Sequence, residues 1–362
     1  MNMNYEPAKK NIMAQEEFPL NDPPEFHYKL LPYGERPYWS PDGKRIAFIE
    51  SNYGDVCEIN IETREVRNLT KDLGTHHSFL RVLFLPNGDY ILIGPKEFKD
   101  RYISRRVESE LWIMDKDAKY PPKPLGRRIF EGCGVSRIAN RITYSMNGNH
   151  DPSIGSPEDF EVHVTEINYG ENGPELGEDK VIYRSHGYDP EPQDFRLEDS
   201  EVIMAEYYNP PEVDKADYFC TVKGVNIKTG EVKLYISESH IHNECEGIFP
   251  DEEYICLESS CDGGALSNTI DLWKLKLDGS MERTRMTRML WKKPWRATNS
   301  NVSPDGKWLA FMLNICGSEA GYGMGLGLLD LEAWGKSKYA KMTETVQSRN
   351  GRKTNPKTGG YI

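Results

Sequence analysis

Short stretches in which apolar and polar residues alternate recur along the chain, and each follows a turn. A period of two residues predicts a β-strand. Six such stretches occur, at Arg45–Glu50, Tyr90–Gly94, Arg141–Ser145, Val202–Tyr207, Tyr254–Glu258 and Trp308–Leu313. A further strand is predicted after each of them, at Val56–Ile61, Glu110–Met114, Glu161–Ile167, Thr221–Ile227, Ile270–Leu277 and Gly325–Leu331. The pattern predicts a protein built from short strands.

Part of this pattern is a sequence repeat. Trp39–Ile49, which contains Ser-Pro-Asp-Gly, returns as Val302–Met312. Related segments begin about 50 residues apart, which is the usual length of one propeller blade of four strands. Their starting points lie near Ser40, Leu85, Ile138, Leu197, Phe249 and Ser303. We therefore predict an all-β, six-bladed β-propeller with four-stranded blades. Seven blades are the alternative and would require a further blade hidden in the chain ends.

The two ends of the chain are predicted to close the ring. Phe26–Leu31 resembles the outer strand that precedes each blade but has no blade in front of it. We expect it to become the outer strand of the last blade, because pairing there protects an exposed sheet edge. The domain prediction is an N-terminal extension at 1–24, one propeller domain at 25–343 and a flexible polar tail at 344–362.

Composition narrows the class of partner. The formal net charge is −12 and there is no long Lys/Arg cluster, which argues against nucleic acid. No apolar run reaches the ~20 residues that span a bilayer, and the first 20 residues lack the apolar core of a secretion signal. We expect a cytoplasmic monomer that binds a small molecule, or a secreted one if a signal has been removed. No phosphate-binding or dinucleotide motif occurs, so no cofactor is expected.

Candidate binding residues lie in the segments that lead from one blade into the next. In a propeller these segments converge on one mouth of the central channel, and convergent polar groups there are the usual site. The segments are Tyr33–Pro37, Gly74–Arg81, Cys133–Arg137, His186–Asp194, Ser239–Gly247 and Trp295–Asn301. From them we select as ligand-binding candidates His76, His77, Arg36, Arg81, Asp194, His240, Asn243, Trp295, Arg296 and Asn299. The alternative is that each residue merely caps a strand or meets solvent.

The densest polar cluster, Ser239–Gly247, supplies the catalytic candidates. If this segment is extended, Glu244 and Glu246 point to the same face with backbones about 6.5–7 Å apart. Two carboxylates at such a separation can act as acid and base around a glycosidic bond, with His242 beside them. One of the two could equally be a structural acceptor. His240 and His242 with these glutamates could also bind a divalent metal, which we keep as the weaker alternative.

Two resemblances add to this reading. Ser40–Gly43 and Ser303–Gly306 resemble the PD40-type repeat of TolB-like β-propellers, which implies a fold and not a function. A narrower likeness to the fungal saponin hydrolases and their bacterial relatives rests on His242–Asp251, Ile270–Gly279, Ser303–Gly306 and Glu319–Gly325.

That family removes a glucuronosyl sugar from triterpenoid saponins. The resemblance thus implies a glycoside over the channel mouth, with Arg81 or Arg296 pairing with a sugar carboxylate. Glu244 and Glu246 would be the first carboxylates to test.

Three functions follow as hypotheses. The first is a glycoside hydrolase that acts on a terpenoid glycoside or another uronic-acid conjugate. The second is a natural-product biosynthetic enzyme, a cyclase or pericyclase, that steers the cyclisation of a hydrophobic intermediate. It is motivated by Met324, where the saponin hydrolases often carry His, and by Trp291, Trp295 and Tyr322. Met324 also counts as a ligand-binding candidate. The third is a non-catalytic binding module.

Overall fold

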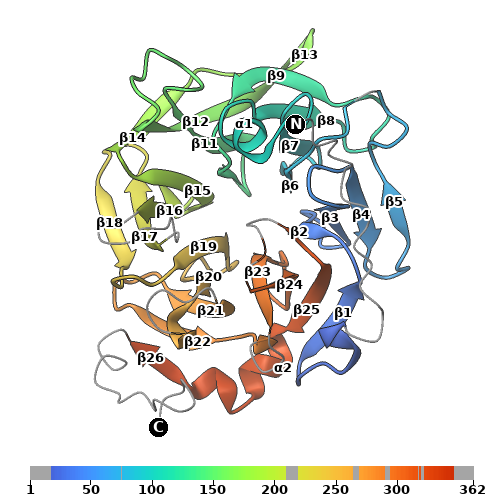
Figure 1. The fold of residues 1–362 in the computed structure, drawn as a ribbon, viewed down its shortest axis with the longest axis vertical. Helices are drawn as coiled ribbons and strands as arrows, with labels where there is room; N and C mark the ends of the chain where they lie inside the picture. Colours follow the sequence, from blue (N-terminus) through green and yellow to red (C-terminus); the bar gives the residue numbers. More distant parts are fainter. Residues whose placement is uncertain are drawn as a thin grey trace, which may run out of the picture.

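Six antiparallel sheets are arranged like blades around one axis (Figure 1). The structure is a computed structural model that describes residues 18–74, 76–208, 219–263, 269–289, 294–316, 318 and 322–345. The prediction of an all-β, six-bladed propeller is confirmed, and the described residues form no seventh blade. The predicted Trp291 and the residues 319–321 lie outside the described residues, as do residues 1–17 and 346–362.

The strands run in chain order from the axis outward in blades one, two and four. Blade one contains β2 (Glu35–Trp39), β3 (Arg45–Ile49), β4 (Val56–Asn60) and β5 (Val66–Asn68). Blade two contains β6 (Arg81–Phe84), β7 (Tyr90–Gly94), β8 (Glu110–Met114) and β9 (Lys123–Arg128). Blade four contains β15 (Asp189–Arg196), β16 (Glu201–Tyr208), β17 (Phe219–Asn226) and β18 (Val232–Ile236).

The other three blades each depart from this plan. Blade three contains β10 (Cys133–Val135), β11 (Arg141–Asn147), the long β12 (Asp159–Gly170) and β14 (Lys180–His186), with β13 (Gly173–Leu176) paired to the far end of β12. Blade five contains β19 (Asn243–Ile248), β20 (Tyr254–Ser259), β21 (Asp271–Lys276) and β22 (Glu282–Arg285), and β26 (Thr343–Thr345) extends it. Blade six contains β23 (Trp295–Val302), β24 (Trp308–Ile315), β25 (Gly325–Asp330) and β1 (His27–Leu31).

The ring closes through β1, as predicted. This strand pairs antiparallel with β25, with His27 opposite Leu329 and Tyr28 opposite Leu328. Ahead of β1, Phe18 and the short 3-10 helix η2 (Pro19–Asn21) pack into the same region, where Phe18 meets the ring of Trp295 edge-on. The first and last segments of the propeller are therefore held together by both backbone pairing and side-chain packing.

The core is divided among the junctions between blades. Successive residues of one strand face opposite neighbours, so that Ile46 and Phe48 join the cluster with blade six while Ala47 and Ile49 join the cluster with blade two. Six such apolar clusters occur, one at each junction. Strands buried on both faces explain why the predicted strands contain so many apolar residues.

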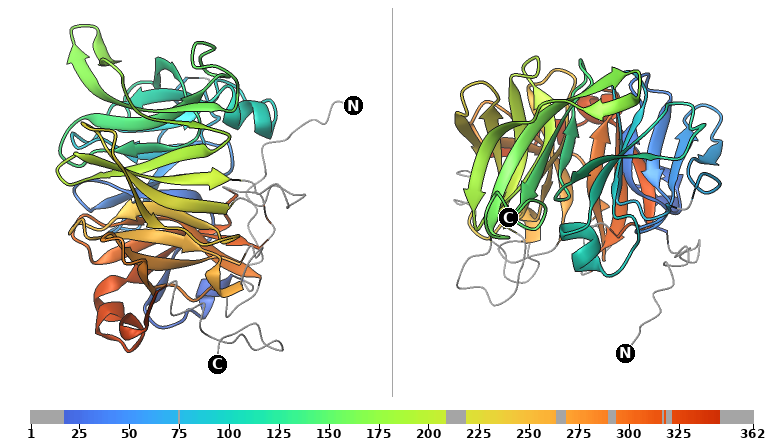
Figure 2. Two further views of the ribbon diagram at one scale, coloured as in Figure 1. Left: turned by 90° about the vertical axis from the view of Figure 1, so that its left-hand side faces the viewer. Right: turned by 90° about the horizontal axis from the view of Figure 1, so that it is seen from above.

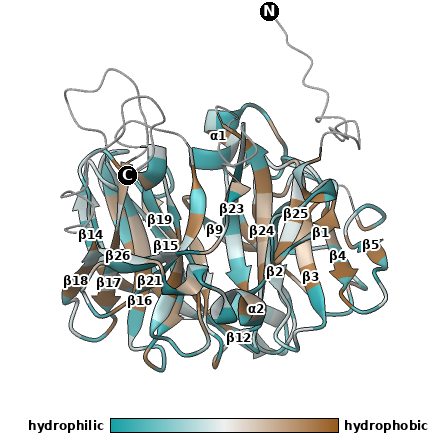
Figure 3. Cartoon of the chain, turned by 90° about the horizontal axis from the view of Figure 1, so that it is seen from below, coloured by the Kyte–Doolittle hydropathy of each residue, from teal (hydrophilic) through white to brown (hydrophobic). Residues whose placement is uncertain are grey.

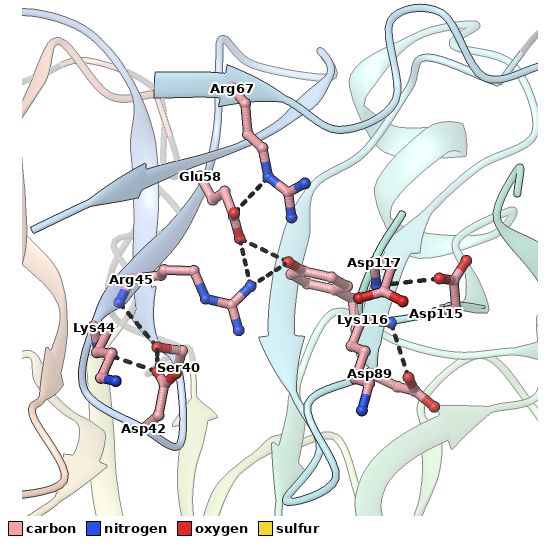
Figure 4. Close-up of polar contacts among 11 residues, drawn as sticks. Ser40, Asp42, Lys44, Arg45, Glu58, Arg67, Asp89, Asp115, Lys116 and Asp117 are labelled. Atoms are coloured by element: carbon pink, nitrogen blue, oxygen red, sulfur yellow. Dashed lines mark hydrogen bonds and ion pairs between the residues drawn. The ribbon is translucent and has the colours of Figure 1, made fainter. Parts of the chain in front are cut away.

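The repeated Ser-Pro-Asp-Gly turns have the same hydrogen bonds in both copies. Asp42 Oδ1 accepts from the Ser40 hydroxyl at 2.5 Å and from the Lys44 N–H at 3.1 Å (Figure 4). Asp305 accepts from Ser303 and Lys307 in the same way, at 2.6 and 3.1 Å. Gly43, with φ 68°, occupies the left-handed position that favours glycine. The repeat is thus a turn that fixes the connection from the first to the second strand.

Helices are few and short. The described helices include α1 (Arg101–Arg106), between β7 and β8, and α2 (Leu331–Lys336), after β25, with 3-10 turns η3 (Cys261–Gly263) and η5 (Tyr339–Lys341). In the views of Figures 2 and 3, α1 projects from one face of the ring. No helix among the described residues has the length and apolar character that a bilayer crossing requires.

Candidate active site in the central channel

Four of the six innermost strands contain a β-bulge next to the axis. The pairing register of β2, β15, β19 and β23 with the second strand of the blade shifts by one residue. The bulges include Arg36, Gln193, Glu246 and Asn299, and Arg36 and Asn299 have φ angles of 49° and 42°. A bulge interrupts the two-residue alternation and re-aims a side chain. This explains why one strand can send polar groups toward the axis and still pack on both sides.

The bulged residues line one small cavity, which we call the waist cavity. It has a volume of about 30 Å³ and is lined by Arg36, Gln193, Glu246 and Asn299, together with Arg81 of β6. Arg81 donates to Gln193 Oε1 at 3.0 Å. Because these side chains come from five different blades, the ring closure that brings the blades together is what assembles the cavity.

A larger cavity lies toward the beginnings of the innermost strands, and we call it the mouth cavity. It has a volume of about 310 Å³ and is lined by Arg101, Tyr102, Arg105, Arg106, Phe130, Glu131, Asp189, Glu191, Tyr207 and His242. The arginines come from α1, which begins where the Asp100 carboxylate accepts the Ile103 N–H at 2.9 Å. Arg106 pairs with Asp189 at 2.9 Å. The cavity therefore combines a basic helix with acidic and aromatic walls.

Glu131 ties α1 to the channel. Its carboxylate accepts hydrogen bonds from both Arg36 and Arg105. Burial by itself would raise the pKa of Glu131, but the two arginines outweigh burial and hold the pKa well below its ordinary value. Glu131 is therefore an ionised, structural partner for the two guanidinium groups.

Glu191 and Glu244 have pKa values that are shifted in opposite directions. Burial, reinforced by the negative charges of Glu131 and Glu244, raises the pKa of Glu191 to about 8. For Glu244, burial is outweighed by hydrogen bonds from His242 and Tyr207, which lower the pKa. His242 Nε2 lies 3.1 Å from Glu244 Oε2. At neutral pH one carboxyl is thus protonated and the other ionised, which is the arrangement that acid–base catalysis uses.

Glu246 and Glu258 form a second pair of acidic residues, and both lie close enough to Glu244 for its charge to raise their pKa values. Glu258 of β20 lies directly across from Glu244 in the sheet, so carboxylates face one another. Burial and the charges of Glu244 and Glu246 raise the pKa of Glu258 well above its ordinary value. Burial and Glu244 likewise raise the pKa of Glu246 to about 7. Asn299 donates its backbone N–H to Glu258 and its side-chain amide to Glu246, the latter at 3.1 Å.

The same region contains the one donor set among the described residues that could hold a metal ion. Ligand atoms of His242, Glu244 and Glu258 all lie within 4.8 Å of one another. One imidazole and two carboxylates suit a divalent cation chemically. The predicted partner His240 is not part of this set. Its Nδ1 instead lies 2.9 Å from the Ser239 hydroxyl.

About half of the predicted site residues come together in the channel. Arg36, Arg81, Asp194, Glu246 and Asn299 line the waist cavity, and His242 lines the mouth cavity. Glu244 contacts His242, and the charges of Glu244 and Glu258 act on Arg296, which donates to Asn314 at 2.6 Å. Asp194 also accepts the Ile248 N–H at 3.0 Å, which ties β15 to β19.

The remaining candidates lie in the walls of the blades. His76 packs against Phe79 and Trp112 and its Nε2 lies 2.6 Å from the Pro95 carbonyl, while His77 lies 2.7 Å from Asp55. Asn243 is buried and accepts from Ser259 at 2.8 Å. Trp295 and Met324 pack with the apolar cluster between blades five and six. In the described structure, none of these residues, nor His240, lines the mouth or waist cavity.

Several important residues were not selected from the sequence. Glu191 lies within the predicted segment His186–Asp194 but was passed over, and Tyr207 and Glu258 are the final residues of two predicted strands. In an antiparallel blade the end of the second strand lies beside the start of the first, so a polar residue there reaches the mouth. The position at the end of a predicted second strand was therefore the sequence signal that could have identified Tyr207 and Glu258. The arginines of α1 had no such signal, since the helix follows no repeat.

A third cavity lies at the opposite end of the channel, and we call it the turn-end cavity. Its volume is about 350 Å³. Its walls include Tyr38, Trp39 and Phe84 and four prolines of the turns that follow innermost strands, Pro41, Pro86, Pro250 and Pro304. This end is therefore mostly apolar, although Arg137 and Glu252 also contribute to it.

Comparisons with known proteins identify the fold. No protein-family model and no curated protein sequence matches the chain. Among solved structures, it is similar to a putative TolB from Agrobacterium tumefaciens, at 13% identity and TM-score 0.53, over 76% of this chain and 84% of that one. A gluconolactonase from Xanthomonas campestris is similar at 12% identity and TM-score 0.52, over 88% and 93% of the two chains. The tricorn protease is similar at 14% identity and TM-score 0.53, over 87% of this chain and 26% of the protease.

At such low identity these likenesses carry information about the fold alone. They agree with the radial arrangement of sheets described above. The chain has a TolB-like β-propeller fold.

Proposed function

We propose that the protein is a hydrolase that cleaves a small anionic glycoside, such as a uronic-acid conjugate, in the mouth cavity. The observation that supports this most strongly is that Glu191, on the wall of the mouth cavity, and Glu244, which contacts His242 of the same wall, have opposite pKa shifts. The resemblance of His242–Asp251 and the later segments to the saponin hydrolases supports the same substrate class.

In this proposal the two carboxyl groups have separate roles. Glu191, which keeps its proton at neutral pH, donates it to the glycosidic oxygen as the carbon–oxygen bond breaks. Glu244, which is ionised, either takes a proton from the attacking water or attacks the sugar carbon itself. Glu246 was predicted for one of these roles, but it lines the waist cavity, whose volume of about 30 Å³ has no room for a sugar.

Recognition of the sugar is assigned to α1. Arg101, Arg105 and Arg106 all line the mouth cavity, and an arginine can hold a carboxylate through two parallel hydrogen bonds. Arg81, the earlier candidate for this role, lines the waist cavity and not the mouth cavity. Tyr102 and Phe130 offer aromatic faces on the same walls. The volume of about 310 Å³ is at the small end of ligand pockets and suits one sugar with part of its aglycone.

The experiment is an assay of free sugar released from a panel of glucuronides, which includes a triterpenoid glucuronide and an aryl glucuronide. We expect release by the wild-type protein and a loss of about 10²–10⁴-fold in kcat for Glu191→Gln, because the acid proton is then missing. Glu252→Gln is the matched control, since Glu252 lies at the other end of the channel and accepts the Leu197 N–H. No release from any substrate, or unchanged turnover in Glu191→Gln, would contradict the proposal.

The second candidate function is the cyclisation of a hydrophobic intermediate in the same cavity. The observation that favours it is the set of three aromatic side chains on the cavity walls, Tyr102, Phe130 and Tyr207. Orientation and exclusion of water would then supply the rate, without an obligatory acid and base. A cyclase would retain most of its turnover in Glu191→Gln but lose it in Phe130→Ala. A binding module would show neither activity and would still bind its ligand.

A further inference from the structure

Three potential metal ligands come together beside the mouth cavity. They are the imidazole of His242 and the carboxylates of Glu244 and Glu258, and one ligand atom of each lies within 4.8 Å of the other two. His242 directly precedes β19 and lies two residues from Glu244, so both face the same side of an extended chain. Glu258 pairs directly opposite Glu244 on the neighbouring strand β20. The backbone of blade five therefore places all three side chains on one side of the sheet.

The distance between the first two ligand atoms suits a shared metal ion. His242 Nε2 lies 3.1 Å from Glu244 Oε2. With metal–ligand bonds of about 2.1 Å, two ligands at right angles are about 3.0 Å apart, and two ligands of a tetrahedral ion are about 3.4 Å apart. The ligand atom of Glu258 lies within 4.8 Å of both, so a small movement of its carboxylate completes the set.

Two of the ligands are oriented by further contacts. His242 Nδ1 lies 3.7 Å from Cys220 Sγ, and Nε2 is the ring nitrogen that faces the carboxylate. The His242 backbone N–H donates to the Ser260 hydroxyl at 3.1 Å. Glu258 accepts the backbone N–H of Asn299, which belongs to blade six. Contacts of this kind are typical of metal sites, because they fix the ring nitrogen and the carboxylate that meet the ion.

The two carboxylates face one another without a basic partner. Glu258 is only 3% exposed, and within the described residues neither it nor Glu244 forms an ion pair with a lysine or an arginine. Glu131 differs, since it pairs with both Arg36 and Arg105. Buried charges in proteins are usually paired or coordinate a metal. A cation between the two carboxylates would supply the positive charge that the side chains around them do not.

We propose that His242, Glu244 and Glu258 bind one divalent transition-metal ion, such as Zn²⁺ or Mn²⁺. The imidazole disfavours Mg²⁺ and Ca²⁺, which prefer oxygen ligands, and the two carboxylates disfavour Cu⁺, which prefers sulfur. His242 lines the mouth cavity, so the ion can enter from there and keep one side open to water or to a ligand. Binding of the ion requires no substrate and so goes beyond the proposed function.

The test uses the full-length protein at about pH 8, because carboxyl groups must give up their protons to bind a metal. Mn²⁺ is added stepwise, and the free ion is counted by electron paramagnetic resonance. We expect saturation at one bound Mn²⁺ per chain, displacement by Zn²⁺, which binds such ligands more tightly, and little displacement by Mg²⁺. No bound ion at about 1 mM Mn²⁺, which half fills a site with a Kd of about 1 mM, would overturn the proposal in favour of protons shared between the carboxyl groups.

One substitution locates the ion. Glu258→Gln keeps the shape of the side chain but removes the negative charge of the ligand, and we expect the affinity for Mn²⁺ to fall at least about tenfold. Glu252→Gln is the matched control, because it makes the same change in charge at the turn end of the channel. Unchanged affinity in Glu258→Gln would overturn the site. If that variant fails to fold, wild-type crystals soaked in Mn²⁺ decide, since an anomalous peak anywhere but between His242 and Glu258 would also overturn it.

The ion should also inhibit the proposed hydrolysis, and this consequence alone rests on that function. An ion on Glu244 occupies the carboxylate that would activate the water or attack the sugar. Saturating Mn²⁺ should therefore abolish sugar release, and a chelator should restore it. Once Glu244→Gln has shown that this carboxylate is required, release that continues at saturating Mn²⁺ would overturn the place of Glu244 among the ligands. A protein that releases no sugar at all leaves the binding measurements to decide the site.

Discussion

The two ends of the central channel have cavities of similar size but different chemistry. The mouth cavity, of about 310 Å³, is lined by arginines of α1 and by glutamates, whereas the turn-end cavity, of about 350 Å³, is lined mainly by aromatic residues, prolines and aliphatic residues. Pro41 and Pro304 at the turn end belong to the repeated Ser-Pro-Asp-Gly turns. Glu191 and His242 at the mouth belong to no repeat.

The difference distinguishes residues that stabilise the fold from residues that are suited to binding a ligand. The turn end contains residues that recur because each blade needs the same tight connection. The mouth contains residues that differ from blade to blade, and their polar groups are buried at a cost in desolvation that packing does not explain. Substitutions at the mouth should therefore change activity, and substitutions at the turn end should change stability.

The largest expected effect is on turnover at the mouth. Glu244→Gln removes the negative charge that would activate the water or attack the sugar, and we expect kcat to fall about 10²–10⁴-fold. The midpoint of thermal unfolding should change little, because a glutamine can still accept from His242 and Tyr207. Sugar release and thermal unfolding, measured on the same preparation, check this. A variant that loses both together would assign Glu244 to the structure and not to the chemistry.

Trp39→Ala tests the prediction that substitutions at the turn end of the channel change stability and not activity. Trp39 is buried in the cluster between blades six and one and also lines the turn-end cavity. Removing a buried tryptophan costs about 3–5 kcal/mol of unfolding free energy through lost burial and the cavity left behind. Turnover per folded molecule should stay within about twofold. The control is Tyr102→Ala at the mouth, where the side chain is 59% exposed and chemical denaturation should show little loss.

The pH dependence of stability should reveal a further buried glutamate, Glu35, at the start of β2. Burial raises the pKa of Glu35 to about 8 from an ordinary value near 4.5. Between these values the folded state holds a proton that the unfolded chain has released, so stability falls as the pH rises from about 5 to about 8. The slope for this one group is about 1.4 kcal/mol per pH unit.

Glu35→Gln should remove this contribution from the pH profile. Chemical denaturation of both proteins at pH 5, 6.5 and 8 measures the difference. The variant should be the more stable protein at pH 8, and the advantage should shrink toward pH 5. An advantage that is the same at all three pH values would show that Glu35 does not titrate in this range.

The smallest expected effect concerns Arg106 of α1. We expect Arg106→Gln to raise the KM for a glucuronide about three- to tenfold with little change in kcat, because a partly exposed charge contributes about 1 kcal/mol to binding. Lys99→Gln is the control, since the exposed Lys99 pairs with Glu108 and does not line the mouth cavity. Steady-state kinetics on both variants would contradict a role for α1 if the two KM values were equal.

The sequence predicts the fold well because the signals for the fold are local. The hydrogen bonds of the Ser-Pro-Asp-Gly turn join residues within five positions of one another, and the strands on either side follow the two-residue period. The closing strand was recognised because Phe26–Leu31 repeats the character of other outer strands. These features require no knowledge of distant contacts.

The site is predicted less well because it depends on departures from those rules. The bulge after Cys245 interrupts the alternation on which the pairing of Glu244 with Glu246 was based, and the charge of Glu244 acts on Glu191 of another blade. The link between Arg36 and Glu131 joins residues 95 positions apart. His76 is an error of the opposite kind. It lies in a segment that was predicted to reach the channel, but its ring packs on Trp112 in the wall of a blade.

The most direct test of the difference between the two channel ends is a crystal structure of the protein soaked with glucuronate, the sugar product of the proposed reaction. We predict density in the mouth cavity, with the sugar carboxylate against the arginines of α1 and the sugar ring beside Glu191. Density in the turn-end cavity, or an empty mouth at a glucuronate concentration that measurably raises the Tm, would contradict the account.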